Sequence, residues 1–406
     1  MDKLPKDWIE GLVGEACNKL VTGKTPSMKI QKYYAKPTYN WFTPSDFDDD
    51  KKWLVSSNRK LDESAIVENK ASKYPAGTLL LVAIGATIGK IGLVKQESSS
   101  NQQITAILLN DKINSEFAYY WFKYIKPIII KNASSATLPI LNQKGISNLP
   151  FKYPPLPEQK RIVSKLDAIF ERIDKSMAML EENIKHTESL MASALDEIFK
   201  KLESKSKVYK ISEFADIKGG KRLPKGLKVQ EEKTDYPYIR VADFQNNGTV
   251  DLSSLQYITK EAHEQIKRYI INPEDLYISI AGTIGKTGII PNELKGSNLT
   301  ENAARFVFKA DFEINNKFIY YFTLSDNFKT QITDATKTVA QPKLALTRLK
   351  NVELPIPDIA LQNKAVERFN RLSTNTYEIV QEQQDKLKNL KALKESILDK
   401  AFKGEI

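Results

Sequence analysis

The sequence predicts an α+β protein in which two related globular parts are each followed by a long helix. Three observations support this prediction. Sequence blocks of the first half recur in the second, β-branched runs bounded by Gly, Pro or Asn occur in both halves, and each half ends in a stretch with apolar residues at helical spacing. With 406 residues, 41% of them hydrophobic and 27% charged, the chain is large enough for several cores.

The internal repeat keeps the order of its blocks along the chain. The pairs of blocks match at offsets of 196, 197 and 203, and they are residues 83–94 with 279–290, 39–47 with 236–244, and 189–202 with 392–405. The offset grows slowly, as small loop insertions would produce. A period of about 200 residues is too long for a solenoid and therefore predicts two homologous halves.

The globular parts are placed at residues 1–154 and 206–355. Their β-branched segments predict strands, namely TLLLVAIG (78–85), ITAILL (104–109), DLYISIAG (275–282) and ARFVFKA (304–310). Two aromatic-rich segments predict helices, namely SEFAYYWFKYI (115–125) and NKFIYYFTL (316–324).

The stretches 155–205 and 356–406 predict long helices. In the first, apolar positions recur at steps of four and three from Leu166 to Ile198, which is a heptad seam. The second seam is weaker and runs through Phe369, Leu372, Thr376, Ile379, Gln383, Leu390, Leu393 and Ile397. An amphipathic helix packed on its own globular part is the alternative, but two copies of similar length favour pairing with each other. Some 35 helical residues span roughly 50 Å.

The net charge of +11 is unevenly distributed. Counted by segment, residues 1–154 carry +7 and residues 206–355 carry +4, whereas 155–205 and 356–406 carry −1 and +1. Neutral helices suit protein–protein packing, and basic globular parts suit a phosphate backbone.

The scarcity of His and Cys excludes several functions. One Cys allows no disulfide within the chain, and two His with one Cys are too few for a Cys/His zinc site. His186 and His263 lie in charge-rich, helix-like segments and are predicted to be solvent-exposed, which argues against a His-dependent nucleophile.

Two motifs resemble catalytic or nucleotide sites only superficially. Gly285-Lys286-Thr287 ends like a P-loop, but Ile280 stands where the first glycine is required. The acidic residues around Asp275 and Glu293 have the loose spacing of a metal-dependent nuclease set, but the spacing is absent from the first half. The sequence therefore indicates a binding protein of pseudo-twofold design.

No segment of the sequence predicts membrane insertion or export. The N-terminus lacks an apolar run that could serve as a signal sequence, and the longest apolar stretch, residues 78–89, is shorter than the ~20 residues of a spanning helix. A cytoplasmic location is the default expectation.

Residues 149–167 (LPFKYPPLPEQKRIVSKLD) closely resemble the junction between domains in specificity (S, HsdS) subunits of type I restriction–modification systems. The GATIGK and GTIGKTG segments, the duplicated architecture and the C-terminal SILDKAFKGEI strengthen the resemblance, which covers the whole chain. The second junction departs from the pattern, because it reads PDIALQ (357–362) and keeps only Pro357 and Gln362. It is therefore open whether partners dock equally on both helices.

The resemblance implies a division of labour within a larger complex. Each globular part is a target recognition domain for one half of a bipartite DNA site. The helices pair as an antiparallel coiled coil, set the length of the spacer and dock two methyltransferase (M) subunits. Restriction (R) subunits join through the complex. S-adenosylmethionine belongs to M, and ATP and Mg belong to R, so the chain itself holds no cofactor and is not an enzyme.

Physical geometry agrees with this implication. A ~50 Å rod spans about 15 base pairs at ~3.4 Å each. Two tandem repeats become related by a twofold axis only if their helices run in opposite directions, and the two domains then meet the duplex with inverted polarity.

Residues in aligned loops are the predicted DNA contacts, with lysines for phosphates and Arg, Asn or Gln for base edges. They are Lys24, Thr43, Ser45, Thr87, Lys90, Gln102 and Gln103 in the first half, and Lys221, Arg222, Arg240, Asp243, Thr283, Lys286 and Asn302 in the second. Lys286 is expected to contact phosphate and Arg240 to read a base. Positions that differ between the halves are the expected sequence readers, such as Arg240 opposite Thr43, and Gln102 and Gln103 opposite Glu301 and Asn302. A structural turn is the alternative role of the Gly-flanked Thr and Lys residues.

The predicted partner-binding residues lie at the helix starts and are Glu158, Gln159, Ile162, Leu166 and Gln362. Other functions remain open at this point. They are a specificity subunit of a modification-only or type IIB/IIG-like system, a coiled-coil adaptor without a DNA role, and an enzyme with an unrecognised carboxylate site.

Overall fold

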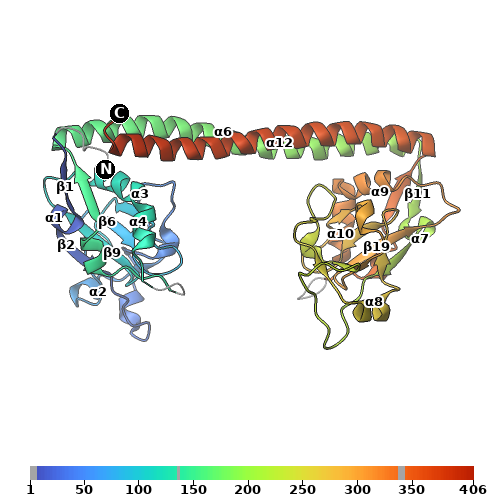
Figure 1. The fold of residues 1–406 in the computed structure, drawn as a ribbon, viewed down its shortest axis with the longest axis horizontal. Coiled ribbons are helices and arrows are strands. Elements are labelled where there is room, and N and C mark those ends of the chain that lie inside the picture. Colours follow the sequence, from blue (N-terminus) through green and yellow to red (C-terminus); the bar gives the residue numbers. More distant parts are fainter. Residues whose placement is uncertain (1–6, 135–137, 337–342) are drawn as a thin grey trace. The chain divides into compact units, whose positions relative to one another are not determined.

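A computed structural model describes residues 7–134, 138–336 and 343–406. Residues 1–6, 135–137 and 337–342, which fall within the two predicted globular parts, lie outside the described residues. The chain forms two compact units: unit 1 holds residues 1–179 and 385–406, and unit 2 holds residues 180–384. Each unit therefore contains one globular part and segments of both long helices (Figure 1).

Unit 1 is built on a five-stranded sheet of order β2-β9-β6-β7-β4, a three-stranded sheet of order β5-β3-β8, and the antiparallel pair β1-β10. Its strands are β1 (Ile9–Leu12), β2 (Cys17–Thr22), β3 (Tyr39–Phe42), β4 (Trp53–Leu54), β5 (Lys60–Leu61), β6 (Leu79–Val82), β7 (Ile91–Val94), β8 (Ser99–Ser100), β9 (Ile104–Leu109) and β10 (Pro150–Tyr153). Its short helices are α1 (Val13–Ala16), η1 (Gln31–Tyr34), η2 (Pro44–Asp46), α2 (Glu63–Val67), α3 (Ser115–Tyr124), α4 (Lys126–Lys131) and α5 (Gln143–Ser147).

Unit 2 has a four-stranded sheet of order β12-β19-β16-β17, a second of order β14-β13-β18-β15, and the antiparallel pair β11-β20. Its strands are β11 (Lys207–Lys210), β12 (Ala215–Gly219), β13 (Pro237–Ile239), β14 (Gln256–Tyr257), β15 (Ile270–Ile271), β16 (Leu276–Ser279), β17 (Thr287–Gly288), β18 (Ser297–Leu299), β19 (Ala303–Phe308) and β20 (Glu353–Ile356). Its short helices are α7 (Ile211–Phe214), η3 (Val241–Asp243), α8 (Lys260–Ile266), η4 (Asn292–Leu294), α9 (Asn316–Thr323), α10 (Asp326–Thr336) and α11 (Leu346–Leu349).

The predicted α+β class and the repeat are confirmed. The order β2-β9-β6-β7 in unit 1 corresponds to β12-β19-β16-β17 in unit 2, and a parallel pair joins β3 to β8 as it joins β13 to β18. The predicted strand segments form β6, β9, β16 and β19, and the aromatic-rich segments form α3 and α9. No helix in the described ranges is both long enough and apolar enough to cross a bilayer.

The two long helices are α6 (Leu156–Glu203) and α12 (Ile359–Phe402), of 48 and 44 residues. Both exceed the ~35 residues expected from the seam, because buried residues continue each helix beyond it, such as Ile162 at the start of α6 and Phe402 at the end of α12. In unit 1 the start of α6 lies beside the end of α12, and in unit 2 the end of α6 lies beside the start of α12. The segments in each unit are thus antiparallel and run side by side along one end of the globular part (Figure 1).

The seam of α6 agrees with burial, since every predicted position from Leu166 to Ile198 is buried or half-buried. The seam of α12 needs a correction. Ile379 and Leu393 are 45% and 46% exposed, whereas Val380 is buried and Lys394 is half-buried. Ile379 and Leu393 are predicted seam positions because both are apolar. The 3.6-residue period of the helix instead places the next residues, Val380 and Lys394, on the contact face.

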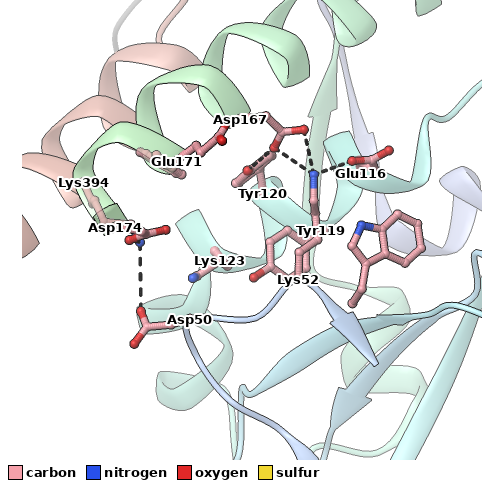
Figure 2. Close-up of a pocket in the computed structure, with 12 residues that line it drawn as sticks. Asp50, Lys52, Glu116, Tyr119, Tyr120, Lys123, Asp167, Glu171, Asp174 and Lys394 are labelled. Carbon is pink, nitrogen blue, oxygen red and sulfur yellow. Dashed lines mark hydrogen bonds and ion pairs between the residues drawn. The ribbon is translucent and has the colours of Figure 1, made fainter. Parts of the chain in front are cut away.

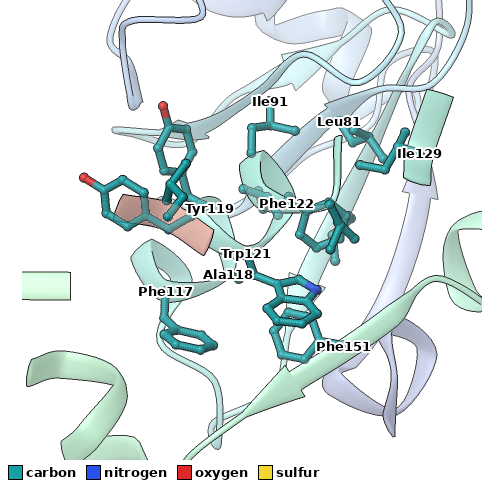
Figure 3. Close-up of a cluster of buried hydrophobic side chains, with 14 of the residues drawn as sticks. Leu81, Ile91, Phe117, Ala118, Tyr119, Trp121, Phe122, Ile129 and Phe151 are labelled. Atoms are coloured by element: carbon teal, nitrogen blue, oxygen red, sulfur yellow. The ribbon is translucent and has the colours of Figure 1, made fainter. Parts of the chain in front are cut away.

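The core of unit 1 gathers around α3 (Figure 3). Phe117 and Trp121 pack on Phe151 of β10, with ring centroids 6.5 and 5.8 Å apart. Phe402, at the end of α12, closes this cluster from the other side at 5.5 Å from Phe117 and 5.2 Å from Trp121. Nearly the last residues of the chain therefore complete the core of the N-terminal globular part.

The core of unit 2 repeats this arrangement. Phe199, near the end of α6, packs on Phe318 and Phe322 of α9 at 5.4 and 5.1 Å, and stacks on Phe369 of α12 at 5.0 Å. Phe199 and Phe402 occupy the same place in the repeat, at an offset of 203. Each unit therefore buries the helix end that follows the other globular part.

Replacing Phe402 by Ala is expected to lower the free energy of unfolding of unit 1 by about 3–5 kcal/mol, because a buried aromatic ring is lost and a cavity remains. Hydrogen exchange read by mass spectrometry should show faster exchange in peptides of α3 but not of α9. Leu393→Ala is the control, since this side chain is 46% exposed. Unchanged protection of α3 in Phe402→Ala would contradict the packing described above.

Candidate nucleic-acid interface

The predicted DNA-contact residues gather where β2, β3 and β6 end and where β8 turns into β9. Gly23 permits the close approach of the end of β2 to the turn after β8, because a Cβ on Gly23 would clash with the Asn101 carbonyl oxygen. Lys24 N donates to Ser100 O at 3.0 Å, and Trp41 Nε1 donates to Lys24 O at 3.1 Å. The backbone around Lys24 is thus fixed while its side chain is exposed and reaches Asn69 Oδ1 at 2.9 Å.

Unit 2 builds the same place with the equivalent residues. A Cβ on Gly220 would clash with the Thr300 carbonyl oxygen. Lys221 N donates to Leu299 O at 2.8 Å, and the Tyr238 hydroxyl donates to Lys221 O at 2.9 Å. The Lys221 side chain is exposed, with its Nζ 5.6 Å from the centre of the Tyr269 ring.

The short helices η2 and η3 place the next predicted residues. Asp46 Oδ2 accepts hydrogen bonds from Thr43 N and Thr43 Oγ1 at 2.7 and 2.8 Å, which leaves Thr43 buried and Ser45 exposed. The equivalent Asp243 is fully buried and accepts from Arg240 N and Nη2, both at 2.7 Å.

This geometry changes the roles assigned to two predicted residues. The buried Asp243 carboxylate is not available at the surface and instead holds Arg240, which also donates to Ser254 O at 3.0 Å. Thr43 is likewise an internal cap of η2 rather than a surface hydroxyl. Asp46, which the sequence analysis did not name, could have been found as the repeat partner of Asp243.

The Gly-flanked turns after β6 and β16 expose Thr87 and Thr283. Gly85 and Gly282 adopt φ angles of 106° and 74°, which other residues rarely take. Lys90 Nζ donates to Phe47 O at 3.0 Å, and Lys286 Nζ donates to the equivalent Phe244 O. Both lysines are half-buried, so tying the turn to the neighbouring loop is part of their role.

The β8–β9 and β18–β19 loops carry the last predicted residues. Gln102 and Asn302 are exposed and Gln103 is half-buried, with its Oε1 accepting from Asn101 Nδ2 at 3.0 Å. Ala83 N and Ile280 N donate to the Gln103 and Asn302 carbonyls, each at 2.8 Å, and these bonds join the loops to β6 and β16. The structure therefore brings the predicted residues together within each unit.

A groove of about 530 Å³ borders this place in unit 2. Residues 219–222, Ile280, Glu301 and residues 343–346 line it, including Lys221, Arg222 and Lys343. Arg222 Nε donates to Glu301 Oε1 at 2.6 Å. Burial acts to raise the pKa of Glu301, but hydrogen bonds from Arg222, from its own backbone N–H and from Thr300 outweigh it, so the pKa lies below its ordinary value and the carboxyl is ionised.

His263 corrects a prediction, because it is half-buried rather than solvent-exposed. Its ring stacks on Tyr236 at 4.4 Å between centroids, and Nδ1 lies 2.7 Å from Asn298 Oδ1. His186 is exposed on α6, with 71% of its side chain accessible. Neither arrangement resembles a catalytic nucleophile with its base. His263 has a structural role, and His186 is a solvated surface residue.

Four of the five predicted partner-binding residues are buried inside this chain. Ile162 and Leu166 belong to the core of unit 1. Gln159 Oε1 accepts from Asn114 N at 2.8 Å, and its Nε2 donates to Lys112 O and Pro154 O. Gln362 makes the equivalent bonds to Asn315 N, Glu313 O and Pro357 O.

The partner-binding assignment of these four residues is therefore corrected to an internal one. Each glutamine fixes the start of a long helix to the loop before α3 or α9. A sequence pattern cannot distinguish such a buried amide from one that docks a partner. Glu158 alone stays at the surface, with 39% of its side chain exposed and its carboxylate paired with Arg161 at 2.7 Å.

A cavity of about 370 Å³ in unit 1 bears on the hypothesis of an unrecognised carboxylate site (Figure 2). Lys52 Nζ lies 2.8 Å from Asp167 Oδ1 and also pairs with Glu116, while Lys394 Nζ lies 2.5 Å from Asp174 Oδ1. Burial, reinforced by Lys394, lowers the pKa of Lys123 in the same cavity. Lys52 joins the globular part to α6, and Lys394 joins α12 to α6, which accounts for the carboxylates without a reaction.

The nuclease-like spacing around Asp275 is also explained by packing. Asp275 forms a buried ion pair with Arg305, with Oδ2 and Nη1 2.5 Å apart. Over the ranges that the structure describes, no three His, Cys, Asp or Glu side chains are arranged to hold a metal ion.

Replacing Gln159 by Leu is expected to lower the free energy of unfolding by about 2–4 kcal/mol, because one buried N–H and two buried carbonyls lose their partner. Chemical denaturation of the purified chain measures this change. Glu158→Gln is the control, since it removes only an exposed ion pair worth less than about 1 kcal/mol. Unchanged stability of the Gln159→Leu chain, together with loss of a binding partner, would instead restore the docking role.

Comparison with known proteins adds independent evidence. The model of the "Type I restriction modification DNA specificity domain" matches residues 5–186 and again residues 203–389. The specificity subunit of the type I restriction enzyme EcoBI from Escherichia coli is 30% identical over 334 residues, covering 75% of this chain and 69% of that protein. The MjaIX specificity subunit from Methanocaldococcus jannaschii is 23% identical and covers 100% of this chain and 94% of its own.

Solved structures agree in fold. A chain from work on the "structural basis underlying complex assembly and conformational transition of the type I R-M system" has a TM-score of 0.78 at 21% identity, with 100% of both chains covered. The HsdS subunit from Thermoanaerobacter tengcongensis has a TM-score of 0.52 at 21% identity, covering 100% of this chain and 98% of that chain. Because the family model matches both halves, the chain belongs to the family of type I restriction–modification specificity subunits.

Proposed function

We propose that this chain is the DNA-recognition subunit of a type I restriction–modification complex. Each globular part reads one half of a bipartite duplex site, and the two long helices set the unread spacer. The helices dock two methyltransferase subunits, and restriction subunits join through the complex. The chain itself performs no catalytic step: S-adenosylmethionine would be held by the methyltransferase, and ATP and Mg by the restriction subunit.

One observation supports this proposal most directly. Both units hold the same loop backbone at the ends of equivalent strands, yet the side chains on it differ, as with the exposed Gln102 and the half-buried Glu301. The same loop backbone with different polar side chains suits two domains that both bind duplex DNA but select different bases. The excess of positive charge also falls in the globular parts rather than in the helices.

The helix starts differ in what they offer to a methyltransferase. Glu158 is exposed at the start of α6, whereas Leu361 occupies the equivalent position of α12. Docking on the two helices is thus proposed to be unequal in its polar contacts. Gln159 and Gln362 make equivalent hydrogen bonds within the chain, so α6 and α12 start at equivalent positions on their globular parts.

The decisive experiment is to express the gene with its methyltransferase in a host without other methylation and to map methylated adenines by long-read sequencing. A bipartite motif with a fixed gap is expected. Methylation without a split motif would overturn the proposal. A motif without cleavage in the presence of the complete operon would place the chain in a modification-only system.

Replacing Lys24 or Lys221 by Ala is expected to weaken duplex binding of the reconstituted complex equally for all sequences, because each exposed ammonium neutralises one phosphate. The slope of log K against log salt should fall by about 0.9 for each lysine. Binding titrations from about 50 to 200 mM salt measure the slope. Lys329→Ala, on α10, is the control; a coiled-coil adaptor without a DNA role would show no salt-dependent duplex binding at all.

A further inference from the structure

The repeat places one side-chain pair at the same point of both units. Thr25 follows Lys24 and contacts Gln102, with Thr25 Oγ1 donating to Gln102 Oε1. Arg222 follows Lys221 and pairs with Glu301, with Nε donating to Oε1 at 2.6 Å. Thr25 and Arg222 stand at an offset of 197, and Gln102 and Glu301 at an offset of 199.

The backbone beneath this pair is held in the same way in both units. Gly23 N donates to Ile104 O and Gly220 N donates to Ala303 O, each at 2.9 Å. The aromatic side chains of Trp41 and Tyr238 bind the next carbonyl along the chain, that of Lys24 or Lys221. The position of the pair is therefore fixed by the scaffold, and only its chemistry differs between the units.

Fold stability gives little reason for the charged pair in unit 2. The Arg222 side chain is 80% exposed, and an ion pair so open to solvent contributes little to folding. The Glu301 side chain is 25% exposed and is itself held, since its Oε2 accepts from Thr300 Oγ1 at 3.0 Å and lies 3.4 Å from the Tyr238 hydroxyl. A fixed carboxylate thus orients an exposed guanidinium beside the groove of unit 2.

We propose that this pair selects one base pair in each half-site: Arg222, positioned by Glu301, reads a guanine, and Gln102, positioned by Thr25, reads an adenine. The inference rests on the proposed function. The bond through Nε leaves the two terminal amino groups of Arg222 without a partner among the described residues, and this fork matches guanine O6 and N7. The Gln102 amide offers the donor and acceptor that match adenine N6 and N7.

The test uses the whole complex with its methyltransferase subunits and S-adenosylmethionine. The complex methylates a duplex library with random half-sites, and the methylated motif is read by sequencing. Arg222→Lys keeps the cation but removes the fork, and it is expected to lose a guanine preference of about 5- to 150-fold at one position of the second half-site. The double variant R222T/E301Q, which gives unit 2 the neutral chemistry of unit 1, should lose it as well.

The reciprocal variant T25R/Q102E should change one position of the first half-site and leave the second unchanged, so that each half-site is the internal control for the other. D326N/K329T is the matched control, since it removes an exposed pair of the same charges on α10. Arg222→Lys also keeps the test decisive if a double variant does not fold.

A motif that stays the same in Arg222→Lys and in T25R/Q102E would overturn the inference and make the pair a phosphate contact or a structural feature. That outcome differs from failure of the proposed function, in which the unaltered complex would itself show no bipartite motif.

Discussion

The structure depends on the packing of the C-terminal end of each long helix. The end of α6 completes the core of unit 2, and the end of α12 completes the core of unit 1. Phe402 closes the aromatic cluster of α3, and Phe199 closes that of α9. Each globular part is covered by the start of the helix that follows it, as by Leu166 in unit 1 and Phe369 in unit 2, but its core also requires the end of the other helix. The exchange explains why the compact units divide the chain at residues 179–180 and 384–385, although the sequence repeats divide it near residue 205.

Polar side-chain contacts fix the position of the long helices on the globular parts. Gln159 and Gln362 each bind the backbone before the aromatic helix, so that α6 and α12 leave the globular parts from equivalent points. The ion pairs of Lys52 and Lys394 then add charge to the junction in unit 1, where unit 2 uses a neutral bond from Tyr321 to Asn370. The same geometry is therefore held by two different chemistries, as expected of diverged repeats.

Much of the fold was predictable because its signals are local. The β-branched runs, the aromatic helices and the seam of α6 all follow from periodicity within a segment. The seam of α12 was misassigned at Ile379 and Leu393, because hydrophobicity alone cannot show that a lysine such as Lys394 lies in the contact face when an aspartate opposes it. The assignment of Gln159 to a partner failed for a related reason, since a buried amide and a docking amide look identical in sequence.

The sequence predicted which loops form the candidate interface, but it did not predict what each side chain in those loops does. The repeat aligned Lys24 with Lys221 and the Gly-flanked turns with each other, and the structure gathers them in each unit. It could not show that Asp243 is buried, that Lys90 and Lys286 bind backbone carbonyls, or that Thr25 meets Gln102. Those contacts join segments tens of residues apart, and only the folded backbone brings them together.

The location of Phe402 also has a consequence for the order of events during synthesis. Unit 2 is a single continuous stretch of chain, so all of its residues are synthesised before residues 385–406, which complete unit 1. Unit 1 begins first but cannot complete its aromatic cluster until Phe402 has emerged. A chain that stops before Phe402 would therefore contain all of unit 2 but an incomplete core in unit 1, with apolar surface exposed for chaperones and proteases to recognise.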